Sequence, residues 1–144
     1  MSNSLYDRDF YAWANQQAAL LRAGRLTEAD IENIAEEIES VGRSEKRELV
    51  SRLSVLLMNL LKWQFQPSHH GTSWQLSIDN TRDALADHLS DNPSLRSQLD
   101  QVMRSAYRRA ANEAAVETGF DRGIFPTDAP YTFEQAMNSD FWPE

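Results

Sequence analysis

The sequence predicts an all-α protein: a bundle of about four main helices followed by an ordered C-terminal tail that contains one short helix. Only five glycines and five prolines occur in 144 residues, and this scarcity favours long helices over many turns. Apolar side chains recur at helical spacing through most of the chain. The segment Leu53–Phe65 is apolar around nearly its whole circumference, so as a helix it must be surrounded by protein.

The first helix is expected to span residues 5–23. Ser4, followed three residues later by Asp7, resembles a capping box at its start. Aromatic and aliphatic side chains then recur at helical spacing. Gly24 can adopt the left-handed conformation of a helix C-cap, so the helix should end there.

The second helix is expected to begin at Thr27, a favoured N-cap residue followed by acids in the first turn. Its apolar stripe consists of Ile31, Ile34, Ile38 and Val41. Continued in the same register, the stripe would place three charged residues in the core: Glu45, Glu48 and Arg52. The apolar face resumes instead at Leu49, displaced by about four residues. We therefore expect a bend or a break near Gly42.

Two further helices follow the loop between Pro67 and Gly71. One should end at Asp91, because the residue before Pro93 avoids the helical region. The other is rich in alanine, which lets a neighbouring helix approach closely, and should end at Gly119.

The remainder, residues 120–144, should form a tail that docks on the bundle or on a partner chain. Four of its side chains, those of Phe133, Met137, Phe141 and Trp142, are too apolar to remain in solvent. Thr132 and Gln135 form a capping box for a short helix. We expect one domain over residues 1–144, with the bundle in 1–119 and the docking tail in 120–144.

Composition narrows the classes of function. The formal net charge of −8 disfavours indiscriminate binding to nucleic acid or to an anionic membrane. The absence of cysteine excludes disulfides, thiol catalysis and Cys-ligated zinc. The apolar segment is shorter than the roughly 17 to 25 residues that cross a bilayer, and the first residues do not resemble a signal peptide. We expect a cytoplasmic protein with no membrane association and no cofactor.

Four aspartates recur at every fourth position of one predicted helix: Asp79, Asp83, Asp87 and Asp91. Such a ridge could bind a divalent cation, but one helix supplies poor coordination geometry, and a solvated face is the simpler interpretation. Asp79 and Asp83 should also lie near the levels of Arg104 and Arg108, so interhelical ion pairs are the better hypothesis. His69 and His70 are alternative metal candidates, although adjacent histidines do not easily ligate one ion.

Arg82 and His88 are the candidate catalytic pair. Their spacing resembles the R-x5-H motif of the HEPN ribonucleases, which are also helical bundles that dimerise. That resemblance would imply that Arg82 stabilises a phosphate and that His88 assists attack by a 2′-hydroxyl. Six residues on a regular helix separate the two side chains by about 120°, however, which argues against convergence.

Lys62 is the one formal charge within the apolar segment. A buried ammonium would need a carboxylate or carbonyl partner, and otherwise the side chain should reach the surface at the helix end. Glu48 and Arg52 are well placed for an ion pair across one helical turn.

Several segments resemble the bacterial family called domain of unknown function twenty-nine (DUF29). They are YDRDFYAW from Tyr6, EEIESVGRSEKREL ending at Leu49, LLMNLLKWQFQP ending at Pro67, SWQLSI, PYTFEQ and the closing DFWPE. The resemblance covers nearly the whole chain and implies a single helical domain of bacterial, cytoplasmic type, with no established activity. Members of that family often carry histidine where this chain has Asn59, a departure that weakens an enzymatic interpretation.

The leading functional hypothesis is a non-enzymatic protein that associates with itself, as a homo-oligomer, or with a partner protein. The interface candidates are Leu53, Leu57, Leu60, Leu61, Trp63, Phe65, Phe141 and Trp142. The motivation is an excess of large apolar groups over what four helices can cover. The alternative is a metal-dependent or HEPN-like RNA hydrolase that uses some of the histidines, Arg82 and the aspartate ridge.

Overall fold

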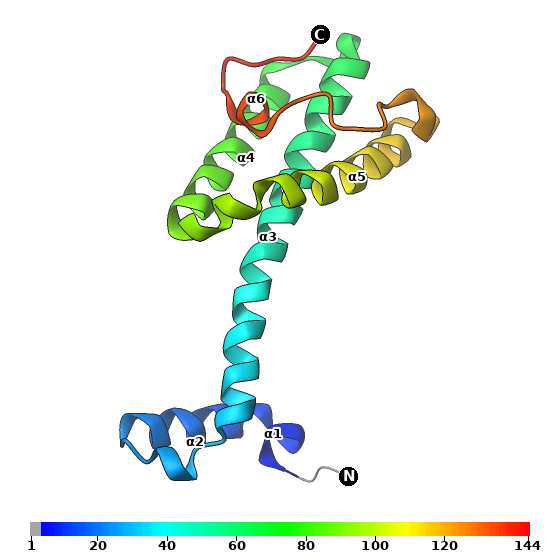
Figure 1. The fold of residues 1–144 in the computed structure, drawn as a ribbon. Coiled ribbons are helices and arrows are strands. Elements are labelled where there is room, and N and C mark those ends of the chain that lie inside the picture. The colour runs from blue at the N-terminus through cyan, green and yellow to red at the C-terminus, as the bar shows by residue number, and fades with distance from the viewer. Residues whose placement is uncertain (1–3) are drawn as a thin grey trace. The chain divides into compact units, whose positions relative to one another are not determined.

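The computed structural model describes residues 4–144, and these residues form helices and loops, as Figure 1 shows. The α-helices are α1 Leu5–Arg8, α2 Phe10–Arg22, α3 Ile31–Phe65, α4 Thr72–Asp91, α5 Leu99–Thr118 and α6 Phe133–Met137. Short 3₁₀ helices cover Leu26–Glu28, Pro67–His69, Pro93–Gln98 and Arg122–Ile124. The all-α class, with four long helices and a short one in the tail, is confirmed.

Backbone contacts divide the chain into two compact units, Met1–Ser44 and Glu45–Glu144. Helix α3 contributes its first part to the N-terminal unit and the rest to the C-terminal unit. The organisation of residues 1–144 as a single domain stays a prediction.

The N-terminal unit begins with two helices where the sequence predicted one. Asp9 interrupts the expected helix with φ −152°, and its carboxylate accepts a hydrogen bond from the Ala12 amide at 3.1 Å, so it becomes the N-cap of α2. The Ser4 hydroxyl donates to the Asp7 carboxylate and does not cap the backbone. The predicted C-cap is confirmed: Gly24 adopts φ +72°, and the amides of Gly24 and Arg25 bond back to the carbonyls of Leu21 and Leu20.

Helix α3 begins at Ile31, so the predicted start at Thr27 is wrong. The Asp30 carboxylate accepts hydrogen bonds from Asn33 Nδ2 at 2.8 Å and from the Trp13 indole at 3.2 Å. The Asp30 amide donates to the Gln17 side chain at 2.7 Å. The bond from Asn33, followed by that from Trp13, lowers the pKa of Asp30. The bonds of Asp30 with Trp13 and Gln17 connect the start of α3 to the two buried residues of α2. Because they join residues that lie 13 and 17 positions apart, local helix propensity could not predict them.

Of the two alternatives expected near Gly42, a bend or a break, the break is excluded, because α3 is one unbroken helix of 35 residues. The register change that motivated it is nevertheless present. Ile31, Ile38 and Val41 are more than half exposed, whereas Leu49 and the leucines after it are fully buried. The helix therefore accommodates the change by exposing its first stripe.

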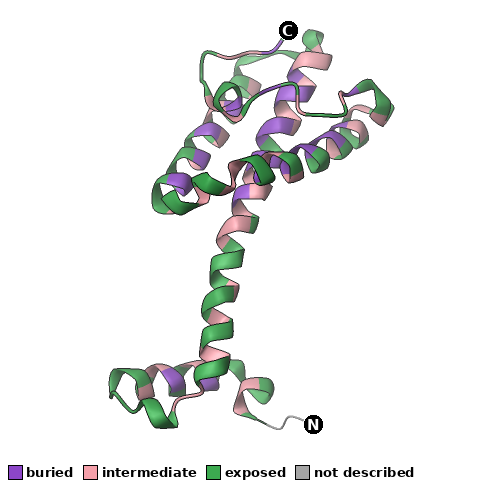
Figure 2. Ribbon diagram, in the orientation of Figure 1, coloured by how far each residue is buried: buried purple, intermediate pink, exposed green. Residues whose placement is uncertain are grey.

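The core of the C-terminal unit surrounds the second half of α3. Six leucines of α3 are fully buried in it: Leu49, Leu53, Leu56, Leu57, Leu60 and Leu61. Helix α4 contributes Ile78, Leu85 and Leu89, and α5 contributes Val102 and the buried alanines at 106, 110, 111 and 114. Figure 2 shows the buried residues gathered on the facing sides of these helices. The prediction that protein surrounds the segment Leu53–Phe65 is confirmed within a single chain for its leucines, whereas Val55 on the other side of the helix is 41% exposed.

The tail docks on this core. Its helix α6 carries the predicted capping box, in which the Thr132 hydroxyl and the Gln135 side chain each accept from the other's backbone amide. The Tyr107 hydroxyl donates to the Pro126 carbonyl at 2.6 Å, and the Tyr131 hydroxyl donates to Gln64 Oε1 at 2.5 Å. Burial raises the pKa of both phenols, so both remain protonated donors at neutral pH.

Gly42→Ala is expected to stabilise the protein by about 0.5 to 1 kcal/mol, because glycine within a helix costs about that much relative to alanine. A Cβ at this position would meet no atom within 4 Å. Urea unfolding followed by circular dichroism measures the change. A loss of stability would show that the helix is not continuous through Gly42.

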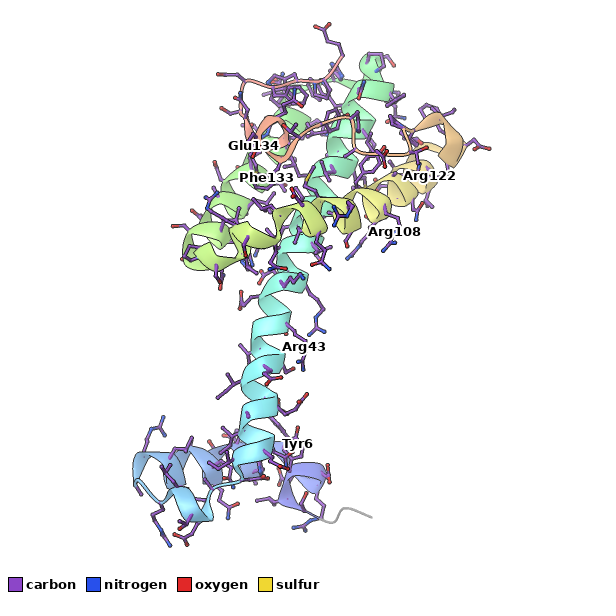
Figure 3. The ribbon with its side chains drawn as sticks, viewed as in Figure 1. Tyr6, Arg43, Arg108, Arg122, Phe133 and Glu134 are labelled. Atoms are coloured by element: carbon purple, nitrogen blue, oxygen red, sulfur yellow. The ribbon has the colours of Figure 1, made fainter. Side chains whose placement is uncertain are left out.

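The phenol of Tyr6 on α1 donates a hydrogen bond to the Glu37 carboxylate of α3, and this bond raises its pKa to about 12 (Figure 3). The folded value lies above the ordinary value of 10.0, so the bond contributes stability below pH 10 that is lost as the pH rises towards 12. Tyr6→Phe should therefore destabilise the protein at pH 8 and have a smaller effect at pH 11. Denaturant unfolding at both pH values tests this, and equal differences would contradict it.

Candidate functional site

Arg82 is an anchor for the tail. Its side chain is only 3% exposed, and its guanidinium donates to the carbonyls of Ala136 and Phe141, each at 2.8 Å. Asp79 accepts a third bond at 3.1 Å, and the guanidinium carbon lies 5.0 Å from the centre of the Trp142 ring. Each of the three guanidinium nitrogens thus donates a hydrogen bond within the protein itself.

His88, one and a half turns further along α4, faces a different neighbour. Its side chain is 8% exposed, and its Nε2 bonds to the backbone carbonyl of Glu45 on α3 at 2.9 Å. Its ring nitrogens also lie 3.7 Å and 3.8 Å from the carboxylates of Glu45 and Glu48. Arg82 contacts the tail and His88 contacts α3, so the structure does not bring the candidate catalytic pair together on one ligand.

The two loop histidines, His69 and His70, each form a hydrogen bond within the protein. The His70 ring stacks on Trp63, with centres 3.5 Å apart and planes inclined by 12°, and its Nε2 donates to the Trp63 carbonyl at 2.7 Å. His69 is exposed and bonds to the Ser68 hydroxyl. Within residues 4–144, neither belongs to a close group of three or more potential metal ligands.

The aspartate ridge is divided between different surroundings. Asp79 pairs with Arg82, Asp83 is exposed, and Asp87 and Asp91 line a cavity against α3. Among the described residues, Asp79 and Asp83 form no ion pair with Arg104 or Arg108, so that expectation is wrong. Lys62 has the carboxylate partner expected of a buried ammonium: its Nζ forms an ion pair with the Glu117 carboxylate at 3.0 Å.

The cavity between α3 and α4 brings His88 and two aspartates of the ridge together with Glu45 and Glu48, which sequence reasoning did not select as site residues. It has a volume of about 510 Å³ and is lined by Glu45, Glu48, Arg52, Ala84, Asp87, His88, Asp91 and Asn92. Glu45, Glu48 and His88 form the one close group of potential metal ligands within residues 4–144. A signal for it was present in the sequence: Glu45, Glu48 and Arg52 are the three residues that interrupt the apolar stripe of α3.

The predicted interface residues are covered by their own chain. Leu53, Leu57, Leu60 and Leu61 are fully buried and Trp63 is 5% exposed. The three aromatic residues Phe65, Phe141 and Trp142 are partly buried against the same core. Their burial therefore does not require a second copy, and association through them stays a prediction that the fold does not need.

The apolar side chains that stay exposed are concentrated elsewhere. Of eleven exposed large hydrophobic residues among those described, seven lie between residues 10 and 41: Phe10, Tyr11, Leu21, Leu26, Ile31, Ile38 and Val41. Figure 2 shows that most of the N-terminal unit is exposed. Ile31, Ile38 and Val41 point to one side of α3, within about 80° of one another at 100° per residue. We call these three residues the α3 apolar face.

Acidic residues border the α3 apolar face. Glu32 and Glu39 each follow an isoleucine of the face, about 100° around the helix. From Asp30 to Val41, both included, there are five acidic residues and no lysine or arginine. The first basic residue is Arg43, which pairs with Glu36 at 3.1 Å and with Glu39 at 3.8 Å. The face is therefore an apolar strip in acidic surroundings.

Fold and site together define a small all-α protein whose conspicuous features are a carboxylate-lined cavity and an exposed apolar helix face. The family described as domain of unknown function DUF29 matches residues 5–142, and the chain belongs to that family. Comparison with curated proteins and with solved structures found no match. Among the described residues, no helix combines the length and the apolar content that crossing a membrane requires.

Arg82→Met is expected to lower the free energy of unfolding by about 2 to 4 kcal/mol, because two buried carbonyls lose charged donors. The tail should also become sensitive to chymotrypsin after Phe141 and Trp142. Urea unfolding and limited proteolysis measure the two effects. Arg108→Met is the matched control, since Arg108 is an exposed residue of α5 (Figure 3), and should change stability by less than about 0.5 kcal/mol. Unchanged stability and protease resistance in Arg82→Met would contradict the anchoring role.

Proposed function

We propose that this protein is a non-enzymatic binding module whose α3 apolar face takes up an amphipathic helix of a partner protein, with basic residues beside the partner's apolar stripe. Recognition of a helix by such a face is a recurring mode of protein–protein interaction. The observation that carries the proposal is the concentration of exposed apolar side chains between residues 10 and 41.

The apolar contribution comes from isoleucine and valine side chains that the fold leaves in water. Ile38 is 67% exposed, Val41 63% and Ile31 53%. Full burial of such a side chain is favourable by about 1.5 to 3 kcal/mol. Ala35, between the two isoleucines, is small and also exposed, so a partner helix can approach the backbone closely. Three large side chains on one strip are consistent with binding of moderate strength.

Charge selects among possible partners. The acidic residues that border the face would repel a second copy presenting the same face in parallel, because glutamates would meet glutamates. Lysine or arginine residues on a partner helix would instead meet carboxylates such as that of Glu39, whose side chain is 69% exposed. A basic partner is therefore favoured over a homodimer through this face. The homo-oligomer remains the competing occupant that the experiment distinguishes.

The hydrolase alternative receives no support from the arrangement of its candidate residues. Arg82 is engaged by backbone carbonyls of the tail and His88 by a carbonyl of α3. A phosphoryl-transfer site would need both groups to reach one substrate.

The test uses two synthetic amphipathic helical peptides with the same leucine stripe, one flanked by lysines and the other by glutamates. The lysine peptide should bind and the glutamate peptide should not, as measured by isothermal titration calorimetry. Ile38→Ser should weaken binding at least tenfold. Leu76→Ser, which removes an equally exposed side chain of α4 (59%), should leave it unchanged. Binding should also weaken as salt is raised, because charge attraction is screened.

If the lysine peptide bound wild type and Ile38→Ser with equal affinity, the proposal would be overturned. Binding would then come from the net negative charge of the protein and not from the α3 apolar face. Light scattering coupled to size-exclusion chromatography identifies the competing occupant. A dimer that Ile38→Ser abolishes would show that a second copy covers the face in place of a basic partner.

A further inference from the structure

We propose that Glu45, Glu48 and His88 form a binding site for a divalent transition metal ion of the zinc type, at the cavity between α3 and α4. One potential ligand atom from each residue lies within 4.8 Å of the other two. The site belongs to the C-terminal unit and is independent of the binding face proposed above.

The hydrogen bond of His88 determines which nitrogen can bind a metal. A backbone carbonyl only accepts, so Nε2 must carry the proton in the 2.9 Å bond to Glu45. In the neutral imidazole, Nδ1 then presents a lone pair. Among the described residues no hydrogen-bond partner reaches Nδ1, and its nearest charged neighbour is Glu48 Oε2 at 3.8 Å. One ring nitrogen bonded to a carbonyl and the other available is the usual arrangement of a metal-binding histidine.

The carboxylate of Glu48 is also oriented so that one of its oxygens can bind a metal ion. Both guanidinium bonds of Arg52 go to Oε1, at 3.0 Å from Nε and 2.6 Å from Nη2, which leaves Oε2 directed towards His88. The Arg52 hydrogen bond lowers the pKa of Glu48, so its carboxylate stays ionised at neutral pH. Arg52 thus positions this ligand without covering its second oxygen.

Glu45 completes the group from one turn earlier on α3. Its ligand oxygen lies within 4.8 Å of the ligand atoms of the other two residues, and its Oε2 accepts a 3.4 Å bond from the Asn92 side chain. Zinc ligands lie about 2.0 to 2.2 Å from the ion, so tetrahedral ligands stand about 3.4 Å apart. The glutamate side chains are each 41% exposed, and can therefore close the difference of an ångström or so.

The charge of the cavity favours a cation. Its lining holds four carboxylates, those of Glu45, Glu48, Asp87 and Asp91, against the single guanidinium of Arg52. A buried imidazole nitrogen with two carboxylates suits zinc or a neighbouring transition metal, whereas Mg²⁺ and Ca²⁺ prefer oxygen alone. The volume of about 510 Å³ leaves room for water to occupy further coordination positions.

The experiment measures binding of Zn²⁺ to the full-length protein, stripped with chelator, by isothermal titration calorimetry and by metal analysis after dialysis. We expect one Zn²⁺ per chain, retained against a large excess of Mg²⁺. Glu48→Gln and His88→Gln should each weaken the affinity at least tenfold. Asp83→Asn is the matched control, since it removes an exposed carboxylate of α4 outside the cavity, and should bind as the wild type does.

Circular dichroism and the Tm of each metal-free variant show that the fold is intact. Glu48 is partly exposed, so Glu48→Gln keeps the test valid should His88→Gln fail to fold. Absence of Zn²⁺ binding at 100 µM total metal would overturn the proposal. So would binding of equal strength in the wild type and in Glu48→Gln, because the ion would then lie elsewhere, for example at the His69 and His70 loop.

Discussion

The second half of α3 is the constraint on which the C-terminal unit depends. Its six leucines occupy an arc of about 140° at 100° per residue, and each is fully buried. So broad an apolar surface is stable in water only when several other elements cover it. Helix α4, the alanine-rich α5 and the tail together cover it, whereas Val55 on the opposite side of α3 is 41% exposed. The close approach of α5 follows from its alanines, which place little side-chain volume between the two backbones.

The fully buried polar atoms of this core are satisfied by the chain itself, and this determines what they can do. The described residues contain no buried side-chain nitrogen or oxygen atom without a hydrogen-bond partner. The guanidinium of Arg82 donates hydrogen bonds to the tail, and the ring of His70 stacks on the ring of Trp63. These two candidate functional residues therefore have structural contacts: the buried Arg82 bonds to two backbone carbonyls of the tail, and the exposed His70 bonds to the Trp63 carbonyl and stacks on its ring.

The side chains that could still bind a ligand lie where α3 changes from an exposed to a buried helix. Glu45 and Glu48 interrupt its apolar stripe, and α4 directs His88 at them. In the N-terminal unit the earlier part of α3 leaves its isoleucines in solvent. One helix thus supplies ligand atoms to a polar cavity and, in the other unit, an apolar face for a partner. The two features differ in chemistry and are tested separately.

The sequence alone determined the fold class, the ends of most helices and the composition of the core. Gly24, Gly119, Pro93 and the Thr132 capping box act through bonds to residues only a few positions away, so local pattern suffices to predict them. The sequence left open whether α3 bends or breaks near Gly42, because a register change in an apolar stripe does not say whether both parts of the stripe are buried. The pairing of Arg82 with carbonyls 54 and 59 residues away, and of His88 with Glu45 and Glu48, was decided only by tertiary packing. Such pairings depend on how helices rotate and approach one another, which no local pattern encodes.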